Sequence, residues 1–167
     1  MSNKIIFRVL NEIDWEPVSE IYQEGINTGN ATFESTVPDW NAWDKAHLKI
    51  CRFVAVINNT IVGWSALSPV SSRCVYGGVA EVSVYVSLKF SGQKIGTKLL
   101  ERLIAESEAH GIWTLQAGIF PENKSSIIIH ERLGFRQVGY RERIGQMNGI
   151  WRDNLFLEKR STSVGIK

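Results

Sequence analysis

The sequence predicts an α/β fold in which one mixed, mostly antiparallel sheet is flanked by about four helices. Short runs of strand length that are rich in β-branched residues alternate with segments whose apolar residues recur every three or four positions. Two turn signals, Asn58-Asn59 and Asn148-Gly149, each join a pair of such runs and predict antiparallel hairpins. A run at 81–86, a helix at 95–110 and a run at 113–120 predict a strand–helix–strand crossover, which adds parallel pairing to the sheet.

Length and composition indicate one globular domain. The 167 residues are enough to bury a core, and we expect residues 1–160 to form the domain and residues 161–167 a flexible tail. Lys and Arg total 19 against 17 Asp and Glu, and this net charge of +2 argues against a nucleic-acid-binding protein with a basic face. No apolar stretch approaches the roughly 20 residues of a membrane span, and two cysteines are too few for a disulfide scaffold. We therefore expect a cytoplasmic protein that binds neither membranes nor nucleic acid.

The first half of the chain is expected to contribute a strand, two helices and a hairpin. Aspartate is a favoured N-cap because its carboxylate accepts hydrogen bonds from the free N–H groups of a first helical turn. Asp14 is therefore expected to cap the first helix, and Pro38-Asp39 to open a second helix that includes Leu48. The elements are, in order, a strand at 4–9, a helix from Asp14 to Gly29-Asn30, the helix after Pro38-Asp39, and strands at 53–57 and 61–67.

The second half is expected to contribute four strands and two helices. Residues 69–78 are expected to be irregular, and Gly111 and Gly134 stand where the last residues after a helix often adopt a positive φ. The elements are, in order, a strand at 81–86, helix 95–110, a strand at 113–120, a helix at 123–133 capped by Asn123, and strands at 135–144 and 150–157.

The loop before helix 95–110 places backbone N–H groups at a helix N-terminus, which is a generic anion site. Its sequence is Ser91-Gly92-Gln93-Lys94-Ile95-Gly96-Thr97-Lys98. A Walker-type loop is excluded because three residues, not four, separate Gly92 from Gly96, and a dinucleotide G-x-G-x-x-G pattern is also absent. A cradle for the pyrophosphate of coenzyme A and an ordinary helix start that binds nothing both remain open.

Seven short stretches carry a resemblance that covers about residues 4–158. They are Ala31–Glu34, Gly63–Pro69, Arg73–Tyr76, Glu81–Val86, Asn123–Ser126, His130–Phe135 and Gly149–Asp153. In this order and spacing the sequence resembles the GNAT superfamily of acetyl-CoA-dependent N-acetyltransferases. It is most similar to the phosphinothricin and methionine-sulfoximine acetyltransferase branch.

The resemblance implies an enzyme that uses acetyl-CoA and no metal. Acetyl would pass directly to the α-amine of a small amino-acid-like acceptor such as phosphinothricin, methionine sulfoximine or methionine sulfone. The alternatives are an acetyltransferase for polyamines, aminoglycosides or protein N-termini, or a non-catalytic module that binds coenzyme A. The resemblance also implies a homodimer formed through the C-terminal strands.

Two residues are expected to take part in proton transfer. Glu81 would take the proton of the acceptor amine, directly or through a water, because a protonated amine cannot attack a thioester. His130 would either donate a proton to the leaving thiolate or only pack its helix against the sheet.

The acceptor pocket is expected to contain Phe33, Arg73, Tyr76 and Glu81. The guanidinium of Arg73 is suited to bind a carboxylate or phosphinate through two parallel hydrogen bonds, and the Tyr76 hydroxyl would add a third. For Phe33 the expected role is a wall of the pocket.

Acetyl-CoA is expected to bind along the strand 81–86 and the loop that follows it. The backbone of residues 84–86 would pair with the pantetheine arm as with a peptide, and Asn123 would hydrogen-bond the same arm. The full set of expected ligands is Val84, Tyr85, Val86, Ser91, Gly92, Gln93, Lys94, Ile95, Gly96, Thr97, Asn123, Ser126 and Arg132.

The loop departs from the family pattern at two positions. The superfamily loop reads Arg/Gln-x-x-Gly-x-Gly/Ala, and aligned on Gly96 this chain has Ser91 for the Arg/Gln and Lys94 for the first Gly. A cradle of backbone N–H groups tolerates such changes if φ stays negative there. We expect Lys94 to contact the pyrophosphate and to supply the positive charge that Ser91 lacks.

Overall fold

The computed structural model describes residues 4–167 and confirms the expected order of helices and strands. The strands are β1 (Ile6–Val9), β2 (Phe53–Ile57), β3 (Thr60–Pro69), β4 (Val79–Val86), β5 (Thr114–Ile119), β6 (Arg136–Met147) and β7 (Ile150–Arg160). The helices are α1 (Trp15–Asn27), α2 (Trp40–Ala46), α3 (Ile95–Ala109) and α4 (Lys124–Arg132). Short 3₁₀ turns lie at 12–14, 74–76 and 88–90.

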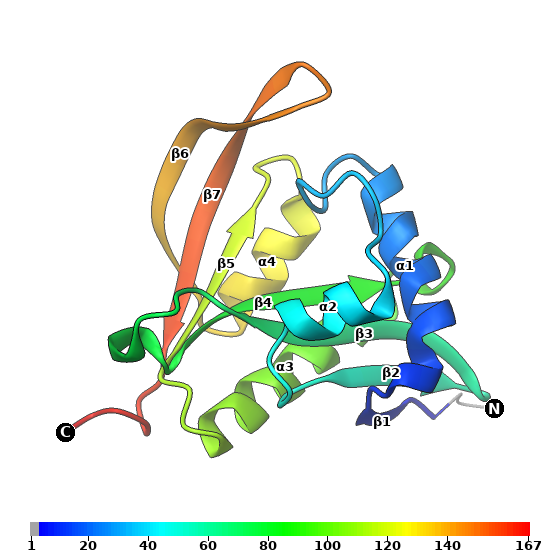
Figure 1. Cartoon of the computed structure of the whole chain (residues 1–167), viewed down its shortest axis with the longest axis horizontal. Coiled ribbons are helices and arrows are strands. Elements are labelled where there is room, and N and C mark those ends of the chain that lie inside the picture. The colour runs from blue at the N-terminus through cyan, green and yellow to red at the C-terminus, as the bar shows by residue number, and fades with distance from the viewer. Residues whose placement is uncertain (1–3) are drawn as a thin grey trace.

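The seven strands form one sheet in the order β1-β2-β3-β4-β5-β7-β6 (Figure 1). Every neighbouring pair in this order is antiparallel except β4 and β5, which are parallel. The predicted mixed, mostly antiparallel sheet is therefore confirmed. None of the helices within residues 4–167 is long and apolar enough to cross a membrane.

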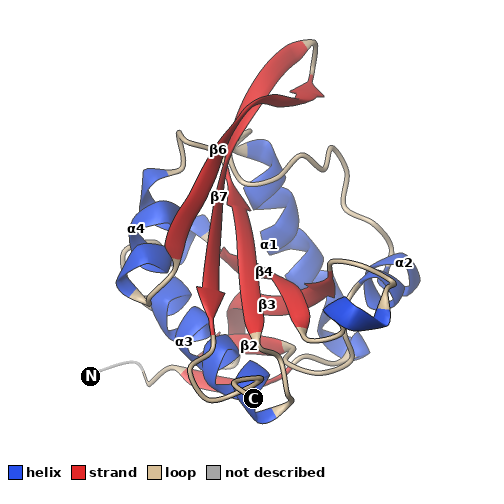
Figure 2. Ribbon diagram, turned by 90° about the vertical axis from the view of Figure 1, so that its left-hand side faces the viewer, coloured by secondary structure: helices blue, strands red, loops and turns tan. Residues whose placement is uncertain are grey.

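Two hydrophobic layers cover the two faces of the sheet. The side chains of Phe53 and Ala55 on β2 belong to the same cluster as Leu99 and Leu103 of α3, whereas Val54, between them, belongs to a cluster with residues of α1 and α2. This alternation follows from the two-residue period of a strand. Accordingly, Figure 2 shows α3 and α4 on one side of the strands and α1 and α2 on the other.

Several expected boundaries need correction. Asp39 caps α2, since its Oδ1 accepts a hydrogen bond of 2.8 Å from the N–H of Ala42, but α2 ends at Ala46 and leaves Leu48 outside. Asp14 does not cap α1 with its side chain. Its buried carboxylate accepts hydrogen bonds of 2.7 and 2.8 Å from the guanidinium of Arg8, and this contact holds the pKa of Asp14 below its usual value.

The C-terminal segment 161–167, predicted to be a flexible tail, makes hydrogen bonds between residues 161 and 165. The guanidinium of Arg160 donates to the carbonyl oxygens of Val164 and Gly165, and the Ser161 hydroxyl accepts from the backbone N–H of Ser163. β6 extends beyond the expected residue 144 because its ladder with β7 continues to Met147, next to the Asn148-Gly149 turn. β7 extends beyond the expected residue 157 because its pairing with β5 continues to Arg160.

The parallel pair β4–β5 is short. The strands pair only at Val79–Thr114, Ala80–Leu115 and Glu81–Gln116, and beyond these positions β5 leaves β4 (Figure 1). The carbonyl oxygen of Gly78 fixes where the pairing begins, since it accepts hydrogen bonds from Trp113 and Thr114 at 2.8 and 3.1 Å. A gap therefore opens in the sheet after Glu81.

A glycine is expected to be required at residue 78, where the pairing of β4 with β5 begins. A methyl group there would lie 2.0 Å from the Trp113 ring, so Gly78→Ala forces the ring or the strand to move and is expected to lower the free energy of unfolding by about 1–3 kcal/mol. The control is Gly139→Ala on β6, where a methyl group meets no atom within 4 Å. Urea unfolding of both variants tests this, and equal stability of the two would contradict it.

Candidate active site

Two cavities meet in the gap between β4 and β5. The first, here called the Glu81 cavity, has a volume of about 620 Å³ and is bordered by β4, β5, β6, β7 and the loop after α1. The second, here called the Lys94 cavity, has a volume of about 710 Å³ and lies between β4, the loop before α3 and the start of α4. Both cavities are lined by Ala31, Val84, Tyr85, Asn123, Ser126 and His130.

The register of β4 turns alternate backbone groups into this gap. The N–H of Ser87 donates to the carbonyl of Val62 on β3, so by the alternation of an antiparallel ladder the backbone groups of Tyr85 and Ser83 also pair with β3. Those of Val84 and Val86 then point away from β3, where β5 has already left. The gap thus offers strand-like hydrogen-bonding groups to an extended ligand.

The loop before α3 has an unexpected backbone conformation. Lys94 is the N-cap residue of α3 and has a φ of 59°, and Gly92 has a φ of 79°. The loop was expected to tolerate a residue other than glycine here only if φ stays negative, and Lys94 does not meet this condition. A left-handed conformation costs an L-residue roughly 1–2 kcal/mol, and it is the conformation that glycine adopts freely, which explains the glycine of the family pattern.

The loop nevertheless fits a phosphate group. The first N–H groups of α3 have no partners within the helix, and they carry the positive end of the helix dipole. The Lys94 cavity at this helix start is lined by Ser91, Gly92, Lys94, Ile95, Gly96 and Thr97. Two further expected ligands, Gln93 and Arg132, are exposed and line neither cavity.

His130 is buried where the two cavities meet. Its ring nitrogen Nδ1 lies 2.7 Å from the carbonyl oxygen of Ser126 and must donate to it, which leaves the lone pair of the neutral ring on Nε2. Nε2 is buried and has no hydrogen-bond partner within residues 4–167. Burial lowers the pKa of His130 below its usual value. At neutral pH the ring is therefore uncharged and Nε2 can accept a hydrogen bond.

Glu81 is the last residue of β4 that pairs with β5. Its side chain is exposed and lines the cavity that carries its name, and its Oε2 accepts a hydrogen bond of 3.3 Å from the Gln116 amide on the parallel partner β5. The carboxylate is therefore placed by the sheet itself at the point where the gap begins.

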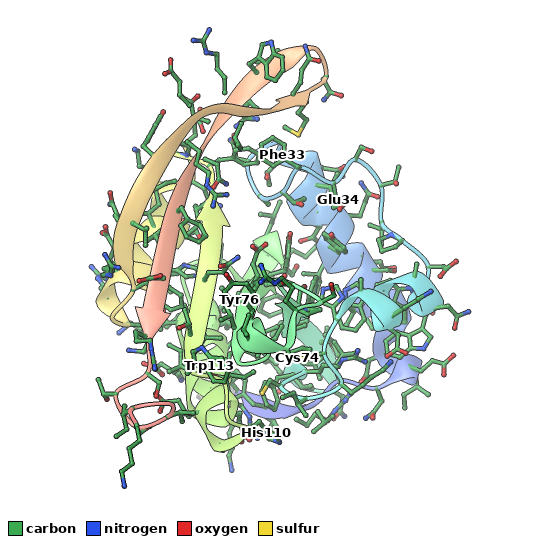
Figure 3. All side chains as sticks on the ribbon, turned by 60° about the vertical axis from the view of Figure 1, so that its left-hand side comes forward. Phe33, Glu34, Cys74, Tyr76, His110 and Trp113 are labelled. Atoms are coloured by element: carbon green, nitrogen blue, oxygen red, sulfur yellow. The ribbon has the colours of Figure 1, made fainter. Side chains whose placement is uncertain are left out.

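The loop after α1 covers the Glu81 cavity. The rings of Phe33 and Phe120 meet edge-to-face with their centres 4.7 Å apart, and Phe33 lies close to Gly145 of β6. Figure 3 shows Phe33 on this loop, next to the β6–β7 hairpin. Arg152 of β7 donates to the carbonyl oxygen of Gly29 and to the side chain of Asn30, both at 2.8 Å. These contacts join β7 to the loop and fix Phe33 as part of the cavity wall.

Asn123 joins the same loop to α4. Its Oδ1 accepts a hydrogen bond from the N–H of Ser126, which confirms the expected helix cap, and its amide nitrogen donates to the carbonyl of Asn30 at 3.2 Å. Both ends of the amide are therefore occupied within the protein, although its side chain still lines both cavities.

The other expected acceptor-binding residues lie elsewhere. Arg73 and Tyr76 are exposed, their side chains contact each other with the guanidinium 5.8 Å from the ring centre, and neither lines a cavity. Figure 3 shows Tyr76 with Cys74 on the irregular segment that precedes β4. The residues of the Glu81 cavity that the sequence did not indicate include Glu34, His47, Arg141 and Asn154. Glu34 ends the Ala31–Glu34 stretch that carries the resemblance, but no role was expected for it. No motif marks His47, Arg141 or Asn154, because tertiary pairing alone brings them together.

Comparison with known proteins identifies the family. A model described as the acetyltransferase (GNAT) family matches residues 14–135, which include the whole loop before α3 and all the residues that line both cavities. The chain belongs to the GNAT acetyltransferase family. The match ends at Phe135, so β6 and β7 lie beyond it.

Individual relatives show which members of the GNAT family the chain is similar to. An L-methionine sulfoximine/L-methionine sulfone acetyltransferase of Pseudomonas aeruginosa is 37% identical over 151 residues, covering 87% of this chain and 88% of that protein. A phosphinothricin N-acetyltransferase of Alcaligenes faecalis is 29% identical and covers 91% and 80%. The crystal structure of a phosphinothricin acetyltransferase from Sinorhizobium meliloti in complex with AcCoA matches with a TM-score of 0.89, 27% identity, and coverage of 98% and 91%.

Substitutions of Lys94 separate backbone strain from charge. Glycine adopts a positive φ without steric cost, so Lys94→Gly is expected to raise the free energy of unfolding by about 1 kcal/mol, whereas Lys94→Ala keeps the strain. Both remove the ammonium group, so both are expected to weaken acetyl-CoA binding severalfold if Lys94 contacts the pyrophosphate. Thermal unfolding and calorimetric titration measure the two effects. Unchanged affinity in both variants would rule out the contact, and equal stability would rule out the strain.

Proposed function

We propose that the chain transfers acetyl from acetyl-CoA directly to the α-amine of a small amino-acid-like acceptor of the methionine sulfoximine, methionine sulfone or phosphinothricin type. Membership of the GNAT family and relatives with these activities support the proposal. The observation that carries it is the shared wall of the two cavities beside Glu81. A thioester arm in one cavity and an amine in the other would meet there.

The residues of the Lys94 cavity are suited to hold acetyl-CoA. Its pyrophosphate would bind the free N–H groups at the start of α3, and its extended arm would pair with the backbone of Val84 and Val86. Acetyl-CoA supplies the activated acetyl group. The chain supplies fixed positions, and positioning of two reactants removes much of the entropic part of the barrier.

Glu81 is proposed as the group that removes the proton of the acceptor. The amine is mainly protonated near neutral pH, and the carboxylate can take one proton directly or through a water. The free amine then attacks the thioester carbonyl and the C–N bond forms. The C–S bond breaks, coenzyme A leaves as thiolate, and the thiolate takes up the second proton that the nitrogen loses as the amide forms. A hydrogen-bond donor at the carbonyl oxygen would stabilise the charge that develops there.

His130 is proposed as a hydrogen-bond acceptor and not as the acid expected from the resemblance. Donation of a proton from Nε2 would require the charged imidazolium, which burial disfavours. The uncharged ring can instead accept a hydrogen bond from the acceptor amine or from a water beside Glu81. A thiolate is a sufficiently good leaving group to depart without an acid.

A homodimer and a cytoplasmic location stay predictions. The C-terminal hairpin exposes large apolar side chains, as an interface between two copies would need: Tyr140 57%, Ile144 54%, Ile150 64% and Trp151 57%.

The proposal is tested by thiol release from acetyl-CoA. Methionine sulfone and phosphinothricin are expected to support turnover, and spermidine is not. In Glu81→Gln the rate constant kcat is expected to fall by roughly 10²- to 10⁴-fold, because the amide cannot take a proton, while the affinity for acetyl-CoA stays the same.

The matched control is Glu101→Gln, which neutralises an exposed carboxylate on α3 outside both cavities. This variant is expected to turn over like the wild type. Activity of Glu81→Gln within twofold of the control would remove Glu81 from the mechanism, and absence of turnover with every amino-acid acceptor would reject the function.

A further inference from the structure

The chain between β4 and α3 begins with two hydrogen bonds to a residue of α1. The N–H of Leu88 donates to Oε2 of Glu24 over 2.8 Å, and the hydroxyl of Ser87 donates to Oε1 of the same carboxylate over 3.3 Å. Ser87 is the residue before the 3₁₀ turn at 88–90, and its own side chain does not cap this turn. The carboxylate of Glu24 therefore caps the turn from another element of the fold.

A close approach of α1 to β4 makes this contact possible. Gly25 follows Glu24 in α1, and a methyl group there would lie 2.7 Å from the Tyr85 ring of β4. Tyr22, on the buried side of the same helix, contacts this ring with the two ring centres 5.0 Å apart. Glycine weakens a helix by roughly 1 kcal/mol relative to alanine, and the space that Tyr85 occupies explains why it stands here. The approach brings the carboxylate of Glu24 to the end of β4.

The turn that Glu24 caps forms part of the wall of the Lys94 cavity. Leu88 and Phe90, the two ends of the turn, line this cavity, and so does Gly25 of α1. Glu24 itself lines neither cavity. Its carboxylate therefore acts on the cavity only through the backbone of the turn. The loop at 91–94 follows directly, so the turn decides where this loop leaves the sheet.

No cation within residues 4–167 forms an ion pair with Glu24, and its hydrogen-bond donors Ser87 and Leu88 are neutral. A negative charge near a site for a pyrophosphate opposes binding by charge alone. A hydrogen bond from a backbone N–H to a carboxylate is, however, about twice as strong as one between neutral groups. The contact therefore fits a residue that fixes the turn and not one that attracts the ligand.

We propose that Glu24 is a positioning residue for acetyl-CoA, which holds the turn at 88–90 so that the loop before α3 is ready to bind the pyrophosphate. Gly92 and Lys94 give this loop two positive φ angles, and a fixed first turn reduces the conformations that the free loop can adopt. Without the cap, binding has to order the loop, which lowers affinity. This inference rests on the proposed binding of acetyl-CoA in the Lys94 cavity.

Two substitutions of Glu24 separate position from charge. Glu24→Gln removes the charge but keeps both contacts, because its amide oxygen can accept from the N–H of Leu88 and its amide nitrogen can donate to the hydroxyl of Ser87. Glu24→Ala removes both contacts and keeps a good helix former in α1. In calorimetric titration, coenzyme A is expected to bind Glu24→Ala roughly 3- to 10-fold more weakly, as on loss of one hydrogen bond, and Glu24→Gln within about twofold of the wild type.

Steady-state kinetics are expected to show the same difference. In Glu24→Ala the KM for acetyl-CoA rises by a similar factor, while kcat at saturating acetyl-CoA changes less than about twofold, because the reacting groups lie at the other end of the arm. The matched controls are Glu20→Ala and Glu20→Gln, which change an exposed carboxylate one turn earlier on α1. Both controls are expected to bind coenzyme A as the wild type does.

Amide hydrogen exchange gives a readout that needs no ligand. The amide of Leu88 is expected to exchange faster in Glu24→Ala than in the wild type or Glu24→Gln, while the amide of Leu103 in the core of α3 stays equally protected. Unchanged affinity in Glu24→Ala, weaker binding without faster exchange at Leu88, or tighter binding in both variants overturns the role of Glu24 and leaves the proposed function intact. Absence of coenzyme A binding to the wild type overturns both.

Discussion

The early end of the β4–β5 pairing is the constraint on which the rest of the structure depends. Parallel strands normally continue side by side, but here the ladder stops at Glu81 and Gln116. Since β4 remains paired with β3 to its last residue, its outer backbone groups have no strand beside them. The gap therefore offers main-chain hydrogen-bonding groups to a ligand, and both cavities lie along it.

Contacts across the gap keep it open at a defined width. The loop after α1 is held from one side by Arg152 of β7 and from another by Asn123 at the start of α4. Aromatic side chains fill the β3–β4 side, where Tyr85 stacks on Trp64 at 4.7 Å and contacts Tyr22 at 5.0 Å. The walls are thus built before any ligand enters.

The site contains three local features that cost stability. Lys94 holds a left-handed backbone, and His130 and Asn154 each bury a polar atom without a partner. Elsewhere in the fold the buried charges of Asp14 and Arg52 have hydrogen-bonded partners. Other buried polar atoms outside both cavities lack a partner in the described part of the chain: Trp43 Nε1, Trp64 Nε1, Ser65 Oγ and Arg102 Nε. Unfavourable groups that cluster in one cleft are typical of sites that a ligand completes.

The sequence predicted the elements but only part of the site. Apolar periodicity and the caps at Asp39 and Asn123 act over a few residues, so they can be read locally. The place of Arg141 on the cavity wall could not be predicted in this way, because it stands beside a bulge in β6 that Asp153 on the neighbouring strand holds. Likewise Arg73 matched a motif, yet its segment places it on Tyr76 outside both cavities. Cross-strand register decides the first case and the path of an irregular segment the second, and no local pattern encodes either.

Amide hydrogen exchange along β4 tests the central claim most directly. If the backbone of β4 is open toward the gap, the amides of Val84 and Val86 exchange rapidly in the free protein, whereas those of Ser83 and Tyr85 exchange slowly because they pair with β3. Coenzyme A is then expected to slow Val84 and Val86 by at least about tenfold, which brings them close to their neighbours. Equal protection of all four amides without coenzyme A, and no change on its addition, would contradict the account.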